Sequence, residues 1–73
     1  MRVIVYSRDH WPPHVHVVTP RGQAKILVEG PAGHPALEWN LGLSRRELAW
    51  ALAAIEDHRD LILNEWKRIH DHP

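Results

Sequence analysis

The chain has 73 residues, no cysteine, and no net charge at neutral pH when its histidines are neutral. This length leaves room for one domain over residues 1–73, because a second hydrophobic core would need more chain. The lack of cysteine excludes disulfides, a thiol nucleophile and thiolate metal sites, and it fits a reducing cytoplasm. No apolar run is long enough to cross a bilayer, and the zero net charge provides no bulk attraction to nucleic acid. We therefore expect a cytoplasmic domain with no membrane partner.

Four segments within the first 41 residues are predicted β-strands. Residues 2–6, 14–19 and 23–29 are rich in β-branched and other apolar residues, which favour strands. Residues 36–41 alternate between apolar and polar side chains, which is typical of a half-buried strand. The proline and glycine of residues 20–22 predict a turn, so the second and third strands should form a hairpin.

The C-terminal part is predicted to be helical. Ser44 and Glu47 have the spacing of a capping box, which begins a helix at the next residue. Apolar residues then recur at intervals of three and four, which defines a helical stripe. The stripe consists of Leu48, Leu52, Ile55, Ile62, Leu63, Trp66 and Ile69. We expect this stripe to be core, or otherwise the seam of a homodimer.

The length of this helical region raises a question about its continuity. One helix over residues 45–69 would be about 38 Å long, whereas a compact domain of this size has a radius of gyration of about 11 Å. Either the helix breaks near Asp57 and His58, with Asp57 capping a second helix, or it continues and pairs with another copy of the chain. We favour the break.

Together these elements predict an α+β fold, a small antiparallel sheet of three to four strands with one or two C-terminal helices on one face. Side chains alternate along a strand, so Val15 and Val17 should point to one face and His14 and His16 to the other. The helices must cover the apolar face, and the histidine face is then open. The open face is expected to carry Tyr6, His14, His16, Lys25, Glu29 and Glu38. The alternation in residues 36–41 places Leu37, Trp39 and Leu41 on the covered face.

The most distinctive stretch is residues 9–16, Asp-His-Trp-Pro-Pro-His-Val-His, which contains three histidines and two prolines. Pro12 and Pro13 fix their φ angles and cannot donate to a β-ladder, so residues 10–13 should form a stiff connection. A tryptophan before proline raises the frequency of a cis peptide bond, but we expect Trp11-Pro12 to be trans.

One hypothesis for the histidines is acid–base chemistry without a metal. Two neighbouring imidazoles beside a cationic side chain can supply the base, the acid and the anion stabiliser that cleave a phosphodiester. The chain would then be a metal-independent ribonuclease. The candidate catalytic residues are Tyr6, His14, His16 and Lys25, with Arg8 or Arg21 at the edge of the group.

A second hypothesis is a metal site. Two histidines at positions i and i+2 of a strand share one face, about 6.5 to 7 Å apart at Cα, and can bind one divalent ion such as zinc. The stiff connection can return His10 as a third ligand to His14 and His16. Glu29 or Glu38 would supply a carboxylate.

A third hypothesis is structural. His10 and His14 would fasten the proline turn by hydrogen bonds to the backbone, and His16 would be an ordinary exposed strand residue. His70 and His72 follow the helical stripe, and we expect both to be disordered.

Residues 6–16 resemble the signature of the small bacterial domain of unknown function 4160, which has a strand, then Asp-His-x-Pro-Pro-His-x-His, then a second strand. Residues 24–26, 43–48 and 58–66 also match that family, so the resemblance covers nearly the whole chain. Val15 differs from the family, in which an aromatic residue is usual at this position.

The resemblance implies a small α+β domain that is the toxin side of a suspected toxin–antitoxin pair. It therefore implies a small cognate antitoxin-like protein as partner, with RNA or translation as the target. No established catalytic residues come with the resemblance, and His10, His14 and His16 are the best matching candidates. The alternatives are a metal-binding or regulatory module without catalysis, and a plain interaction domain that uses its helical stripe.

Overall fold

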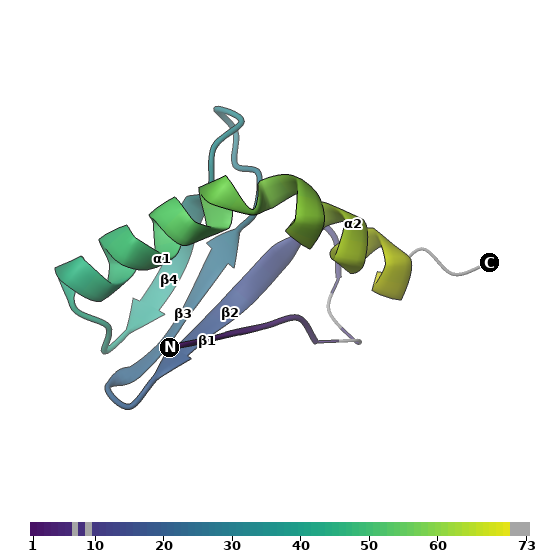
Figure 1. Ribbon diagram of the computed structural model, residues 1–73. Helices are drawn as coiled ribbons and strands as arrows, with labels where there is room; N and C mark the ends of the chain where they lie inside the picture. Colours follow the sequence, from purple (N-terminus) through teal and green to yellow (C-terminus); the bar gives the residue numbers. More distant parts are fainter. Residues whose placement is uncertain (7, 9, 71–73) are drawn as a thin grey trace.

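The computed structural model describes residues 1–6, 8 and 10–70, and it is an α+β fold. Four strands form one antiparallel sheet in the order β1-β2-β3-β4, and two helices follow (Figure 1). The strands are β1 (Arg2–Ile4), β2 (His14–Thr19), β3 (Gly22–Leu27) and β4 (Ala36–Leu41), and the helices are α1 (Arg45–Asp57) and α2 (Arg59–His70). The predicted fold class is therefore confirmed. Two strands end earlier than predicted, β1 by two residues and β3 by two residues.

The register of the sheet assigns its two faces. Residues that pair across neighbouring antiparallel strands lie on the same face. His16 pairs with Ile4 on β1 and with Lys25 on β3, whereas Val17 pairs with Ala24. Val17 and Ala24 are fully buried, and His16 and Lys25 are half-buried. The histidines and Lys25 thus lie on the face opposite the core, as predicted, and we call it the open face.

Strand β4 contains a bulge at Glu38. Lys25 pairs with Trp39, and the next residue of β3, Ile26, pairs with Leu37, so β4 has one residue more than β3 at this point. An extra residue reverses the alternation of side chains along the strand. Leu37 therefore faces the same side as the buried Ile26, and Trp39 faces the side of Lys25.

The bulge corrects two predictions. Trp39 and Leu41 pair with Lys25 and Gln23, which are on the open face, so neither of them faces the helices. Leu41 is accordingly 69% exposed. The prediction assumed an unbroken alternation along residues 36–41, and a bulge leaves no mark in that pattern.

Helix α1 begins with the predicted capping box. The Ser44 hydroxyl accepts a hydrogen bond from the Glu47 backbone N–H (3.1 Å), and the Glu47 carboxylate accepts one from the Ser44 backbone N–H (2.9 Å). This helix lies across the face of the sheet opposite the histidines (Figure 1).

The helical region breaks at His58, which confirms the predicted break. His58 has φ −110° and ψ 20°, and its backbone N–H donates to the carbonyl of Ala54 (3.1 Å) at the end of α1. Its own carbonyl accepts from the N–H of Ile62 (2.9 Å), which is the first backbone bond of α2. The cap position of α2 is therefore His58, and the prediction that Asp57 caps this helix is wrong because Asp57 is the last residue of α1.

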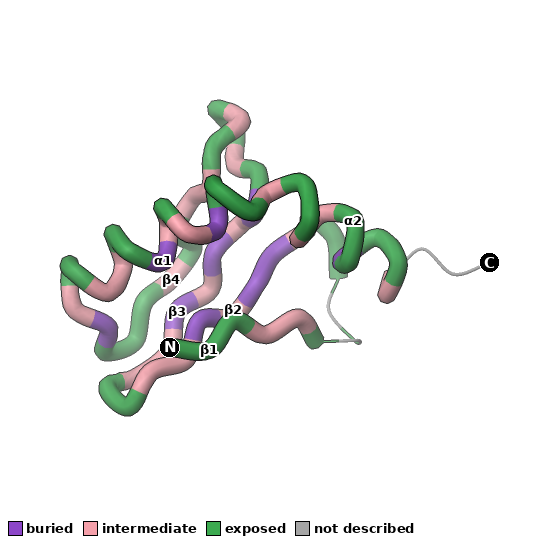
Figure 2. The backbone as a smooth tube through the Cα atoms, viewed as in Figure 1, coloured by how far each residue is buried: buried purple, intermediate pink, exposed green. Residues whose placement is uncertain are grey.

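The main core lies between the sheet and α1, where the buried tube segments of Figure 2 face one another. Ala51 and Ile55 of α1 are buried in it, and Leu48, Leu52, Ile62 and Leu63 pack against it half-buried. The remaining core residues are Val15, Val17, Ala24, Ile26, Val28 and Leu43. Most of the predicted helical stripe is thus core within one chain, while Trp66 is buried elsewhere, against the histidine segment.

Candidate functional site

A row of three rings crosses the open face from β1 to β4. Tyr6, which follows β1, lies with its ring centroid 4.8 Å from that of His16 on β2, at an interplanar angle of 71°. The His16 ring lies 5.8 Å from the Trp39 ring of β4, at 59°. We call Tyr6, His16 and Trp39 the aromatic row. Lys25 of β3 pairs with both His16 and Trp39, so it lies between these two rings in the sheet.

His16 is held by Gln23. The Nε2 atom of the Gln23 amide lies 3.1 Å from Nδ1 of His16. The Gln23 amide can donate from this nitrogen to Nδ1 of His16. The Gln23 amide can also present its oxygen to a protonated Nδ1, so this contact is compatible with either charge state of His16.

His14 is buried at the start of β2, with 4% of its surface exposed. Its Nδ1 lies 2.9 Å from the carbonyl oxygen of Pro12. The Trp11-Pro12 peptide bond is cis, so the expectation of a trans bond is wrong. A carbonyl oxygen only accepts, so Nδ1 carries the proton and the lone pair of neutral His14 is on Nε2. This bond confirms the part of the structural hypothesis in which His14 fastens the proline turn.

The two imidazoles lie side by side and have different partners at Nδ1. Their ring centroids are 5.5 Å apart, with an interplanar angle of 73°. Nδ1 of His14 contacts a backbone carbonyl, whereas Nδ1 of His16 contacts the Gln23 amide. Two neighbouring imidazoles can serve as a base and an acid when one is neutral and the other is protonated.

The end of α2 supports the His14 side of the site. Trp66 is fully buried, and its ring lies 4.8 Å from Trp11 and 6.2 Å from His14. His70 stacks on Trp66 at 3.7 Å and 18°. The Nδ1 and Nε2 atoms of His70 lie 2.7 Å and 2.9 Å from the carbonyl oxygens of Trp66 and Tyr6. His70 thus ties α2 to the segment after β1, and the expectation that it is disordered is wrong. His72 lies outside the described residues.

The charged groups near the aromatic row are mixed in sign. The Lys25 ammonium lies 2.7 Å from the Glu38 carboxylate, which is at the bulge. Arg21 pairs instead with Glu47 at the start of α1 (3.6 Å), so it does not join the candidate site. Arg8 is exposed, and Glu29 is exposed in the bend that follows β3.

The metal site of His10, His14 and His16 stays a prediction. Within residues 1–6, 8 and 10–70, no group of three or more His, Asp or Glu side chains is arranged to hold a metal ion. His10 is exposed, whereas His14 is buried and His16 is half-buried.

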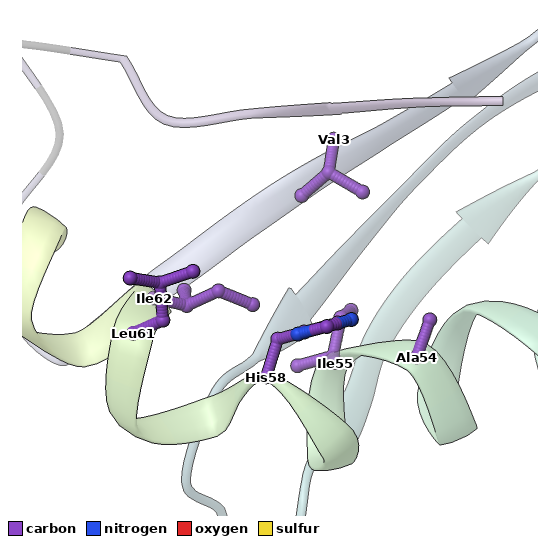
Figure 3. A pocket seen from close by; sticks show the side chains of 6 residues that line it. All are labelled: Val3, Ala54, Ile55, His58, Leu61 and Ile62. Atoms are coloured by element: carbon purple, nitrogen blue, oxygen red, sulfur yellow. The ribbon is translucent and has the colours of Figure 1, made fainter.

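An apolar groove of about 340 Å³ lies on the helix side of the sheet, opposite His14 and His16. Figure 3 shows Val3 of β1 above it and Ile55, His58 and Ile62 of the helical region around it, together with Ala54 and Leu61. Its lining contains no charged carboxylate, lysine or arginine, so the groove offers no acid–base pair. A homodimer or partner contact through the helices stays a prediction.

Sequence reasoning missed three residues that shape the site. The alternation of residues 36–41 predicts Trp39 on the core side, because a bulge does not change the order of apolar and polar residues. Gln23 has no sequence motif, because its role depends on the contact with His16 on the neighbouring strand. His70 could have been found from its spacing, since it lies four residues after Trp66, on the same helix face.

No helix among the residues with described structure is long and apolar enough to span a membrane.

The comparisons with known proteins place the chain in a family. No curated protein and no solved structure matches the chain significantly. A family model described as Domain of unknown function (DUF4160) matches residues 1–67, which contain the whole sheet, α1 and most of α2. The chain therefore belongs to this family, as its sequence resemblance indicated.

Proposed function

We propose that the open face is an acid–base site for the cleavage of RNA, and that the chain is the toxin-like component of a two-protein module. The neighbouring imidazole rings of His14 and His16, with centroids 5.5 Å apart on the open face, are the observation that carries this proposal. A neutral imidazole can accept a proton and a protonated one can donate it, which are the two proton transfers that phosphodiester cleavage requires.

The reaction uses the ribose 2′-hydroxyl of the substrate. His14 accepts the hydroxyl proton through one water molecule, because its side chain is almost fully buried, while the 2′ oxygen attacks phosphorus. The bond from phosphorus to the 5′ oxygen breaks, and protonated His16 donates its Nε2 proton to this leaving oxygen. The products are a 2′,3′-cyclic phosphate and a 5′-hydroxyl, and the total charge of the two rings is unchanged.

Three further residues have supporting roles in this proposal. Lys25 pairs with His16 across the sheet, and its ammonium offsets the charge that develops on the phosphate. Tyr6 holds one side of the His16 ring by its edge contact. Gln23 accommodates both charge states of His16 by turning its amide, which lets His16 lose and regain a proton.

The test is cleavage of a synthetic RNA by the purified full-length chain in the presence of EDTA. We expect a 2′,3′-cyclic phosphate product, and a loss of about 100-fold or more in rate for His16→Ala, because general acid catalysis contributes at least this factor. His34→Ala is the matched control, since His34 is an exposed loop histidine that pairs with Glu56 (2.7 Å). Equal rates for both variants would exclude His16 from the reaction.

The cellular part of the proposal has its own test. Expression of the chain should arrest growth, and His14→Ala or His16→Ala should relieve the arrest while the protein stays folded. The antitoxin-like partner is then a small protein whose co-expression restores growth. Arrest that survives both substitutions would remove the histidines from the mechanism.

A further inference from the structure

We infer that the aromatic row binds an unpaired base by stacking, so that the ligand of the open face is single-stranded RNA. This inference rests on the proposed function for the choice of RNA. It assigns a role to Trp39, which takes no part in the proton transfers.

The architecture is that of a stacking platform. The sheet is four-stranded and antiparallel, α1 covers one face, and the rings lie on the other face. Sheets of this kind bind unpaired bases on aromatic side chains of the uncovered face. Here the rings come from three places, the segment after β1, the centre of β2 and the residue that follows the bulge of β4, so one base can contact more than one element.

The tilt of the rings keeps stacking surfaces available. Neighbouring rings of the row meet at 71° and 59°, so each contact within the row covers at most one face of one ring. Tyr6 is 43% exposed, and Trp39 is half-buried. A parallel stack of the three rings would have hidden the same faces from a ligand.

The ligand must be single-stranded for a geometric reason. In a duplex, each base face is covered by its neighbours, so the aromatic row can reach base faces only in loops and single strands. A base on Trp39 also brings its phosphate close to Lys25, because these two residues pair across β3 and β4.

The charges of the open face predict that stacking, not phosphate contact, provides most of the affinity. Lys25 is paired with Glu38, and Arg2 shares the face because it pairs with Val18. When these two cations and the protonated His16 of the proposed mechanism are counted, the slope of log K against log salt should be no steeper than about −2.1, at about 0.7 per phosphate contact.

The experiment uses a fluorescent 2′-O-methyl oligouridylate, which lacks the attacking hydroxyl and is bound without being cleaved. Fluorescence anisotropy with the full-length chain gives the dissociation constant for the single strand and for the same strand annealed to its complement. Trp39→Ala should weaken binding by about 5- to 100-fold, the usual effect of losing one base stack. Trp39→Phe should retain most of the affinity. Trp50→Ala is the matched control, because Trp50 is 61% exposed on α1, and it should not change binding.

The outcomes separate this inference from the proposed function. The stacking inference would be overturned by any one of three results. These are equal binding of single strand and duplex, no binding of the single strand, and equal effects of Trp39→Ala and Trp50→Ala. If Trp39→Ala unfolds, Trp39→Leu replaces it, since leucine is apolar but has no π face. Binding that depends on Trp39, without cleavage of natural RNA, would support this inference and contradict only the catalytic proposal. Cleavage of natural RNA at an unchanged rate by Trp39→Ala would support the catalytic proposal and contradict the stacking inference.

Discussion

His16 and Trp39 belong to strands that are not neighbours, yet their ring centroids lie 5.8 Å apart on the open face. Both residues pair with Lys25 of the intervening strand, and their side chains meet across it. Trp39 points to this face only because of the bulge at Glu38. The candidate site therefore depends on a backbone irregularity of β4 as well as on the histidines.

His14 and His16 should differ in their effect on stability. His14→Ala should lower the free energy of unfolding by about 1–3 kcal/mol, because it leaves the Pro12 carbonyl without its bond and removes a buried ring. His16→Ala should cost less, since His16 is only half-buried. Urea unfolding of both variants measures the difference, and His14→Asn, which keeps a donor near the Nδ1 position, should recover part of the loss. Equal costs for the two alanine variants would contradict the buried role of His14.

Trp66 should be the most sensitive tryptophan. It is fully buried against Trp11, His14 and His70, so Trp66→Ala should cost about 3–5 kcal/mol. Trp50→Ala should change stability by less than about 0.5 kcal/mol, because Trp50 is 61% exposed. Thermal and urea unfolding of this pair test the aromatic packing between α2 and the proline turn. A small effect of Trp66→Ala would mean that this packing contributes little to stability.

Removal of the Glu38 charge should strengthen RNA binding. The Glu38 carboxylate lies 2.7 Å from the Lys25 ammonium, and both side chains are partly exposed. Glu38→Gln should raise affinity for the 2′-O-methyl oligouridylate by about two- to fivefold, because the interaction energy of a partly exposed ion pair is of this size. Lys25→Met should lower the affinity. Anisotropy at low salt measures both, and the two effects should shrink as salt is added. Tighter binding by Lys25→Met would contradict the cationic role of Lys25.

The capping box should make the stability of α1 depend on pH. The backbone N–H of Ser44, which donates to the Glu47 carboxylate, is the main cause that lowers the pKa of Glu47 below its usual value of 4.5. A carboxylate with a lowered pKa in the folded state stabilises the fold above its unfolded pKa, and this contribution is lost as pH falls through the folded pKa.

Two variants test this dependence. Glu47→Gln should show a smaller loss of stability than the natural chain when pH is lowered from about 7 to about 3, because the group no longer titrates. Ser44→Ala should cost about 1 kcal/mol at neutral pH, as is usual for the loss of an N-cap. Identical pH profiles for Glu47→Gln and the natural chain would show that the carboxylate does not contribute.

Local patterns predicted most of this fold. The capping box at Ser44 and the histidine side of β2 follow from spacing alone, because each depends on residues close in sequence. The helix break was predicted from the length of the helical region relative to the size of the domain. The alternation of Val15 and Val17 against the histidines identified the open face correctly.

The missed features depend on contacts between distant residues. The bulge that turns Trp39 is a property of the pairing between β3 and β4, and the Gln23 bond to His16 arises only when β2 and β3 are in register. His70 is ordered because it meets Trp66 within its own helix and the Tyr6 carbonyl across the fold. Of these contacts, only the one between Trp66 and His70 has a local pattern, a spacing of four residues on one helix face.

The central claim is that His16 donates a proton in a reaction that uses the 2′-hydroxyl of RNA. The most direct test is the cleavage rate of a short RNA by the purified chain, by His16→Ala and by His34→Ala, alongside the same RNA with one 2′-deoxy nucleotide at the cleaved bond. We predict that the deoxy substitution blocks cleavage at that bond, and that His16→Ala is slower by about 100-fold or more. His34→Ala should cleave at the natural rate. Cleavage of the natural RNA by His16→Ala at an unchanged rate, or cleavage at the 2′-deoxy bond, would contradict the account.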